Sequence, residues 1–234
     1  RASVMLLMTM LTSIGAWAAP APSQFPIYHG DLGTEAKPYQ IKSATDLNKL
    51  AEDVNNGYSY EGVYFKVTAP INYTYTNAWN VESDENNFTA IGNWNKPFKG
   101  IFDGNHQTIS GIRIYKGGND LSNDCYLGIF GCISGSAVVK DITLTNTRIT
   151  GYNEVAGIVG IIPENNSATV SGCIVGENVA IHTAAIDYNS NYNYSHGGIV
   201  GFLGSGTVSG CFSAATLTVV SEVSSSSQYN SHGA

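Results

Sequence analysis

Histidines are the first residues to test for chemistry, because histidine serves both in metal sites and in acid–base catalysis. The chain has five among its 234 residues: His29, His106, His182, His196 and His232. None belongs to an H-E-x-x-H sequence, and no pair of cysteines has C-x₂-C spacing, so the sequence predicts no zinc centre. The calcium-binding G-G-x-G-x-D nonapeptide is absent as well. We therefore expect no metal site and no cofactor.

Carboxylates could support hydrolysis of glycans, which usually needs two carboxyl groups about 5 to 9.5 Å apart. In a repeat protein the simplest source is an acid that recurs at one repeat position. Asp103 and Asp141 each align by sequence with glycines in the other repeats, so no such column of acids is predicted. Asp120, Asp124 and Glu154 lie in expected turns and leave a pair borne by loops open. We expect no enzyme.

The four cysteines, an even number, suggest disulfides if the protein is exported. However, Cys173 and Cys211 occupy one repeat position, where Ile112 and Ile142 stand in other copies. A thiol can fill an apolar position as a small hydrophobic residue. We therefore expect free thiols, with disulfides as the open alternative.

Tyrosine and asparagine gather in two insertions, "AAIDYNSNYNYSHG" at 184–197 and "SEVSSSSQYNSHG" at 221–233. Tyrosine rings and amide groups suit the binding of sugars or protein surfaces. The sequence therefore predicts weak binding residues at Tyr188, Tyr192 and Tyr194, with solvated loop tips as the alternative. Trp79 and Trp94 form a second aromatic candidate, which packing in the first repeats would explain equally well.

Two short sequence motifs, here called the first and the second phrase, recur along the chain. The structural elements that they form must position these side chains. The first is Gly-Ile-Phe-Gly or Gly-Ile-Val-Gly at 128–131, 157–160 and 198–201, with a weaker copy at 100–103. The second, of the type Thr-Val-Ser-Gly-Cys, begins at residues 108, 138, 169 and 207. These periods predict an all-β protein, a right-handed parallel β-helix (β-solenoid) with three short strands per coil, each coil holding roughly 28 to 41 residues. A β-propeller is the alternative.

Charged residues avoid the repeats. Residues 1–125 hold 21 of the 29 charged side chains and residues 126–234 hold eight. Parallel strands stack about 4.8 Å apart, so a charge at a repeated position would lie beside its own copy and repel it. Stacked coils therefore account for the scarcity of charge.

The second phrase also predicts a corner of the coil. Its apolar residues are spaced i, i+3, as in the pairs Val139 with Ile142 and Val170 with Cys173. In a straight strand such residues face opposite sides. Both can face the interior only if the chain bends between them, and a Ser-Gly pair permits such a bend.

A cap is predicted before the repeats. Ser43 and Asp46 resemble a helix start, an apolar stripe follows at helical spacing, and Gly57 is a suitable stop. We expect a helix at 44–56 over the open end of the first coil. The expected organisation is a signal peptide with a truncated start (1–18), a leader and capping region (19–97), and repeats truncated at the C-terminus (98–234). A separate small α/β domain before the repeats is the alternative.

These phrases resemble the GLUG-motif repeats of bacterial cell-surface and secreted adhesin-like proteins, and the stretches 33–57 and 88–114 are similar to the leader that often precedes them. Isoleucine stands at 129, 158 and 199, where the motif has leucine. The resemblance implies an extracellular scaffold that binds glycan or protein ligands, and it supplies no catalytic residues. The alternative it leaves is a non-catalytic accessory region of a larger secreted peptidase or polysaccharide-degrading enzyme.

The first residues predict export. The run from Val4 to Ala18 is uncharged and mostly apolar, and it ends in an A-x-A cleavage site. It is shorter than the about 20 residues that a membrane-spanning helix needs, so we expect a secreted or cell-surface protein without a membrane span. The net charge of −7 argues against nucleic acid as a partner. Host or microbial glycans or surface proteins are the partners that the resemblance implies. Because Ser195-His196-Gly197 recurs as Ser231-His232-Gly233, we expect the chain to be cut inside a repeat.

Overall fold

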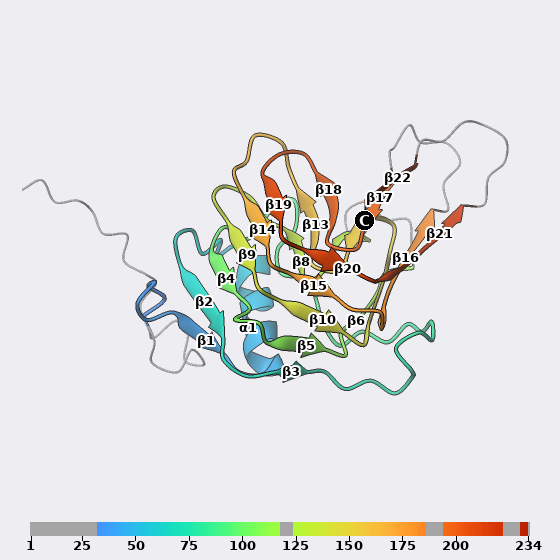
Figure 1. The fold of residues 1–234 in the computed structure, drawn as a ribbon, viewed down its shortest axis with the longest axis horizontal. Helices are drawn as coiled ribbons and strands as arrows, with labels where there is room; N and C mark the ends of the chain where they lie inside the picture. The colour runs from blue at the N-terminus through green and yellow to red at the C-terminus, as the bar shows by residue number, and fades with distance from the viewer. Residues whose placement is uncertain (1–31, 118–123, 186–193, 222–229, 234) are drawn as a thin grey trace, which may run out of the picture.

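The computed structural model of the protein describes residues 32–117, 124–185, 194–221 and 230–233. Its strands stack into five sheets, and each sheet takes one strand from each successive coil (Figure 1). Neighbouring strands pair in parallel in all five sheets. The prediction of an all-β parallel solenoid is confirmed.

Sheet 1 holds β1, β2, β4, β9, β14 and β19 (Tyr39–Ile41, Tyr64–Val67, Ile101–Asp103, Val138–Lys140, Thr169–Ser171 and Thr207–Ser209). Sheet 2 holds β3, β5, β10, β15 and β20 (Ile71–Asn72, Thr108–Ser110, Thr143–Thr145, Ile174–Val175 and Phe212–Ser213). Sheet 3 holds β6, β11, β16 and β21 (Arg113–Tyr115, Thr147–Gly151, Val179–Ala185 and Thr216–Ser221). Sheet 4 holds β7, β12, β17 and β22 (Cys125–Leu127, Asn153–Ala156, Tyr194–Gly197 and Asn230–Gly233). Sheet 5 holds β8, β13 and β18 (Phe130–Cys132, Val159–Ile162 and Val200–Leu203).

A complete coil, such as the one from β9 to β13, therefore has five short strands instead of the three expected. The sequence "TLTNTRIT" reads as one β-branched strand, but Asn146 adopts a positive φ of 47° and divides it into β10 and β11. Asparagine and aspartate enter this left-handed region more readily than most residues, and they do so without the glycine that would mark a turn in the sequence.

The predicted corner is confirmed. Val139, Ile142, Val170 and Cys173 are all fully buried. The residues that turn the chain between them have positive φ, 56° at Asp141 and 62° at Gly172. The i, i+3 spacing of the second phrase thus reflects two inward-facing residues on either side of a bend.

The register of the earliest copies differs from the sequence alignment. Ile101 pairs with Val138, so β4 lies in sheet 1, where the strands of the second phrase stack. Thr108, which the sequence aligned with Val138, pairs with Thr143 in sheet 2 instead. The position beside Phe130 is taken by Ile91. The sequence alignment fails at the turn of Asn105 and His106, two residues with positive φ. Because of this turn, the link from β4 to β5 is longer than the link from β9 to β10.

This shift changes the neighbours of the two aligned acids. Asp103 lies beside Lys140 and not beside the glycines of the first phrase. Lys140 Nζ is 3.2 Å from Asp103 Oδ2 and 3.6 Å from Asp141 Oδ2. The two carboxylates therefore share one ammonium group, which offsets the repulsion between them.

The capping helix is confirmed as α1 (Ala44–Asn55), one residue shorter than expected. Ser43 Oγ accepts a hydrogen bond from the Asp46 N–H (3.2 Å), and Asp46 Oδ2 accepts one from the Lys42 N–H (2.9 Å). The apolar stripe joins the same hydrophobic core as the strands of the coils, through Leu47, Leu50, Ala51 and Val54. Figure 1 shows α1 beside the first strands of sheets 1 and 2, at the N-terminal end of the stack.

Candidate functional site

The predicted tyrosine site falls mainly outside the described residues. Tyr188 and Tyr192 lie there, and Tyr194 is placed only as the first residue of β17, where its backbone pairs with that of Asn230. The strands that flank the two insertions pair in the expected order, β16 with β21 and β17 with β22. Both insertions therefore connect sheet 3 to sheet 4. Binding by these tyrosines stays a prediction.

An aromatic stack stands on the early coils. Trp94 is 53% exposed, and its ring lies 5.8 Å from that of Tyr126 with an interplanar angle of 27°. Trp94 occupies a tight turn in which Asn93 and Lys96 exchange two main-chain hydrogen bonds of 3.1 Å. Because the turn is closed in this way, the indole is held at the surface. Trp94 therefore packs on an early coil through Tyr126 of β7 and still leaves about half of its surface exposed.

A groove of about 480 Å³ runs between α1 and the segment 86–89. Five of its nine lining residues are asparagines, Asn48, Asn55, Asn56, Asn86 and Asn87. Asn93 Nδ2 donates to Asn55 Oδ1 (3.4 Å) and Lys96 Nζ donates to the Asn55 carbonyl (2.8 Å). The wall of the groove is thus bonded to the turn that carries Trp94.

Three of the groove's asparagines brace its walls. Asn55 Nδ2 donates to the Ala90 carbonyl (3.0 Å), and Asn86 Nδ2 donates to the Tyr115 carbonyl (3.2 Å). Asn87 Nδ2 donates to the carbonyls of Thr74 (2.9 Å) and Gly111 (3.0 Å). These bonds join α1, the segment 86–89 and the strands of the solenoid, so the groove is formed before any ligand binds.

Two further asparagines keep polar atoms available. Asn48 and Asn56 are exposed on the groove. Asn48 accepts from the Tyr73 hydroxyl through Oδ1 (2.8 Å), which leaves its Nδ2 without a protein acceptor in the described part of the chain. The Asn56 side chain has no hydrogen bond there. A carboxamide both donates and accepts, so these groups suit a neutral polar ligand.

A partly buried carboxyl group lies in the strand next to the aromatic stack. In the register of β7 and β12, Glu154 stands beside Tyr126. Burial raises the pKa of Glu154 to about 7, and Asn153 Nδ2 donates to its Oε1 (2.9 Å). Burial also raises the pKa of Tyr126 to about 12, and the Glu154 charge adds to that rise.

The structure places one of the other two candidate acids. Asp124 is buried just before β7, and its carbonyl accepts from the Tyr152 N–H (2.8 Å). Asp120 lies outside the described residues. Within the described ranges, no group of three or more His, Cys, Asp or Glu residues is placed to hold a metal ion.

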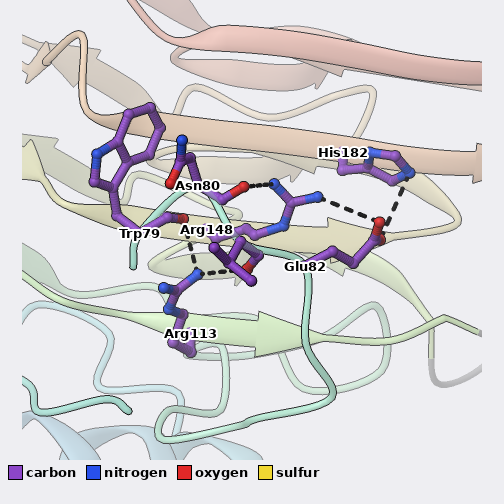
Figure 2. A network of polar contacts seen from close by, with 7 residues as sticks. Trp79, Asn80, Glu82, Arg113, Arg148 and His182 are labelled. Carbon is purple, nitrogen blue, oxygen red and sulfur yellow. Dashed lines mark hydrogen bonds and ion pairs between the residues drawn. The ribbon is translucent and has the colours of Figure 1, made fainter. Parts of the chain in front are cut away.

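A second polar site fastens the residues 75–85, here called the strap, across sheet 3. The Arg113 side chain is buried, and its guanidinium donates to the main-chain carbonyls of Ala78, Asn77 (3.0 Å) and Trp79 (2.8 Å). The same guanidinium carbon lies 4.4 Å from the centre of the Tyr75 ring. Figure 2 shows the strap crossing over the strands that carry Arg113 and Arg148, with Glu82 reaching toward His182 on the next strand.

The far end of the strap is held through Glu82. Arg148 Nη2 is 3.6 Å from Glu82 Oε2, and His182 Nε2 is 3.8 Å from Glu82 Oε1 (Figure 2). Burial lowers the pKa of His182, while the Glu82 charge opposes that change. This network is not apparent in the sequence, because its members come from four separate segments.

The chain was compared with known proteins. No protein-family model matches it, and no solved structure matches it. Halomucin of Haloquadratum walsbyi is 30% identical over 158 residues, which cover 65% of this chain and 2% of halomucin. A Gly-rich membrane protein of Evansella cellulosilytica is 27% identical over 149 residues, covering 64% of this chain and 16% of that protein. The chain thus spans a small part of both relatives. Among the described residues, no helix is long and apolar enough to cross a membrane.

Proposed function

We propose that the chain is part of an exported, adhesin-like repeat scaffold that binds glycan or protein ligands at a cell surface. The observation that carries the proposal is the braced groove beside the exposed Trp94–Tyr126 stack. Ligand sites are concave, combine apolar surface with a few well-placed polar groups, and are mostly formed in advance. The groove and the stack together meet this description.

Export is supported by two features of different kinds. The apolar run from Val4 to Ala18 with its A-x-A site is typical of a signal peptide. One of the two relatives is named as a membrane protein, which places that relative at a membrane. The resemblance to GLUG repeats is consistent with the same location, and the adhesin-like role follows from it as a proposal.

The proposal is tested by capture of ligands on the whole 234-residue chain. The purified chain is applied to a glycan array, to immobilised extracellular matrix and bacterial surface proteins, and to intact cells. We expect saturable binding to at least one of these. Trp94→Ala should weaken it, whereas Phe212→Ala, which removes a 62% exposed ring from sheet 2, should not. Binding to none of the three surfaces would refute the proposal.

A further inference from the structure

We propose that the groove and the Trp94–Tyr126 stack form one binding site for a neutral oligosaccharide. One sugar ring would stack on the indole of Trp94, and the neighbouring units would lie along the amides of the groove. This inference rests on the proposed function and narrows its ligand from glycans or proteins to uncharged glycans.

The charges around the groove favour a neutral ligand because they compensate one another. Lys49 Nζ lies 3.2 Å from Glu52 Oε2 and 2.7 Å from Asp53 Oδ1. Lys96 is the second cation nearby, and its Nζ is bonded to the Asn55 carbonyl (2.8 Å). Glu52 is the one charged residue among those that line the groove, and Lys49 pairs with it. The groove therefore offers no surplus of cations, which a phosphorylated, sulfated or nucleic-acid ligand needs.

The polar groups of the groove match the hydroxyl groups of a sugar. A hydroxyl donates one hydrogen bond and accepts others, and a carboxamide offers both functions in return. Asn56 and the Nδ2 of Asn48 are available, since both side chains are exposed and only the Oδ1 of Asn48 is engaged, by the Tyr73 hydroxyl (2.8 Å). The Asn55 and Asn87 amides hold the walls in place, so binding would order few side chains.

The aromatic stack supplies the apolar contact that sugars use. A pyranose ring has a face of C–H groups that packs on an aromatic plane, and tryptophan offers the largest such plane. Trp94 remains 53% exposed although Tyr126 stacks on it at 5.8 Å. The Asn93–Asn55 hydrogen bond of 3.4 Å places this platform beside the groove wall, so one chain of sugars could contact both.

The test is isothermal titration of the whole chain with short neutral oligosaccharides built from glucose, mannose, galactose or N-acetylglucosamine. Polygalacturonate and heparin serve as charged probes. We expect at least one neutral series to bind and both charged probes to bind more weakly. Trp94→Ala should reduce the affinity by about tenfold or more, as truncation of a central aromatic contact does. Asn56→Ala should reduce it by a smaller factor.

Phe212→Ala is the matched control, because it removes an exposed ring far from the groove in sequence, on β20, the last described strand of sheet 2. Its affinity should equal that of the original chain, and circular dichroism should be the same for all variants. Saccharide binding that survives both Trp94→Ala and Asn56→Ala would place the site elsewhere and overturn the inference. If the chain captures only protein ligands, this inference fails and the proposed function stands. If nothing binds, both fail.

Discussion

At the scale of single residues, the closing glycine of the first phrase leaves room for the main chain around it. A Cβ on Gly160 would lie 2.7 Å from the carbonyl oxygens of Glu154 and Gly131 and from the Leu127 nitrogen. A Cβ on Gly201 would lie 2.6 Å from the Gly160 oxygen. Each of these glycines therefore lies against the main chain of the coil before it, which explains why the phrase recurs with glycine at its end.

Gly160→Ala should lower the free energy of unfolding by about 2–4 kcal/mol, because backbone atoms on both sides cannot move away from the added methyl group. Urea unfolding followed by circular dichroism measures the change. Gly176→Ala is the control, since its Cβ would meet its nearest atoms at 3.5 Å, an ordinary contact. Equal stabilities for the two variants would contradict the packing role of the phrase.

Glu154 should make stability depend on pH. Burial raises the pKa of Glu154 from 4.5 to about 7. Between pH 4.5 and 7 the folded chain keeps a proton on Glu154 that the unfolded chain releases. The contribution of Glu154 to the free energy of unfolding is therefore greatest below about pH 4.5 and is lost as the pH rises to about 7. The loss amounts to at most about 3 kcal/mol.

Glu154→Gln should therefore flatten the stability profile between pH 4.5 and 7 and raise stability at neutral pH. Thermal unfolding across this range measures the profile. Glu164→Gln, a change at an exposed carboxylate, is the control and should leave the profile as it is. A profile that keeps its slope in Glu154→Gln would show that this carboxyl group is solvated.

At the scale of elements, the strap explains an exception to the avoidance of charge. Arg113 and Arg148 are neighbours in the register of β6 and β11, where like charges should repel. The strap carbonyls accept hydrogen bonds from the guanidinium of Arg113, and Glu82 forms an ion pair with the guanidinium of Arg148. A column of two arginines is therefore accommodated because a separate segment neutralises it.

Arg113→Met should release the strap, since several strap carbonyls lose their donor at once. We expect a loss of about 2–4 kcal/mol in stability and faster chymotrypsin cleavage after Tyr75 and Trp79. Lys66→Met is the control, because Lys66 is half-buried on β2 and makes no polar side-chain contact in the described residues. Unchanged cleavage in Arg113→Met would mean that other contacts hold the strap.

Structural features that recur in every coil were predictable from the sequence, and features that occur only once were not. The two phrases identified the stacked strands, and the spacing of Val170 and Cys173 identified a corner, because every coil repeats the same packing. The divisions at Asn146 and the longer turn at Asn105 occur without a repeated glycine, so strand number and early register were missed.

The groove could not be predicted for a related reason. Its walls depend on pairs such as Asn55 with Asn93 and Asn87 with Gly111, which are far apart in sequence and occur once. No periodicity reports such contacts. The exposed Trp94 was noted as an aromatic candidate, but only the closed turn at 93–96 distinguishes a surface platform from a packed side chain.

At the scale of the whole molecule, burial changes along the stack. The side chains of Val170 and Cys173 are fully buried, with a coil on either side. Their counterparts one coil later, Val208 and Cys211, are only partly buried and pack at the margin of the core. Among the described residues β19 and β20 are the last strands of sheets 1 and 2, so one side of each has no strand beside it.

This gradient predicts unequal hydrogen exchange. Stability in a solenoid comes from contacts between adjacent coils, so a coil with one neighbour opens more readily than a coil with two. In the 234-residue chain, amides of β19 and β20 should exchange faster than those of β14 and β15, and the strands next to α1 should be protected at the other end.

Exchange measured by mass spectrometry on peptic peptides, at a concentration where the chain is monomeric, resolves these segments. Equal protection of β14 and β19 would mean that something covers the last coil, and a loss of that protection on dilution would identify a second copy of the chain as the cover.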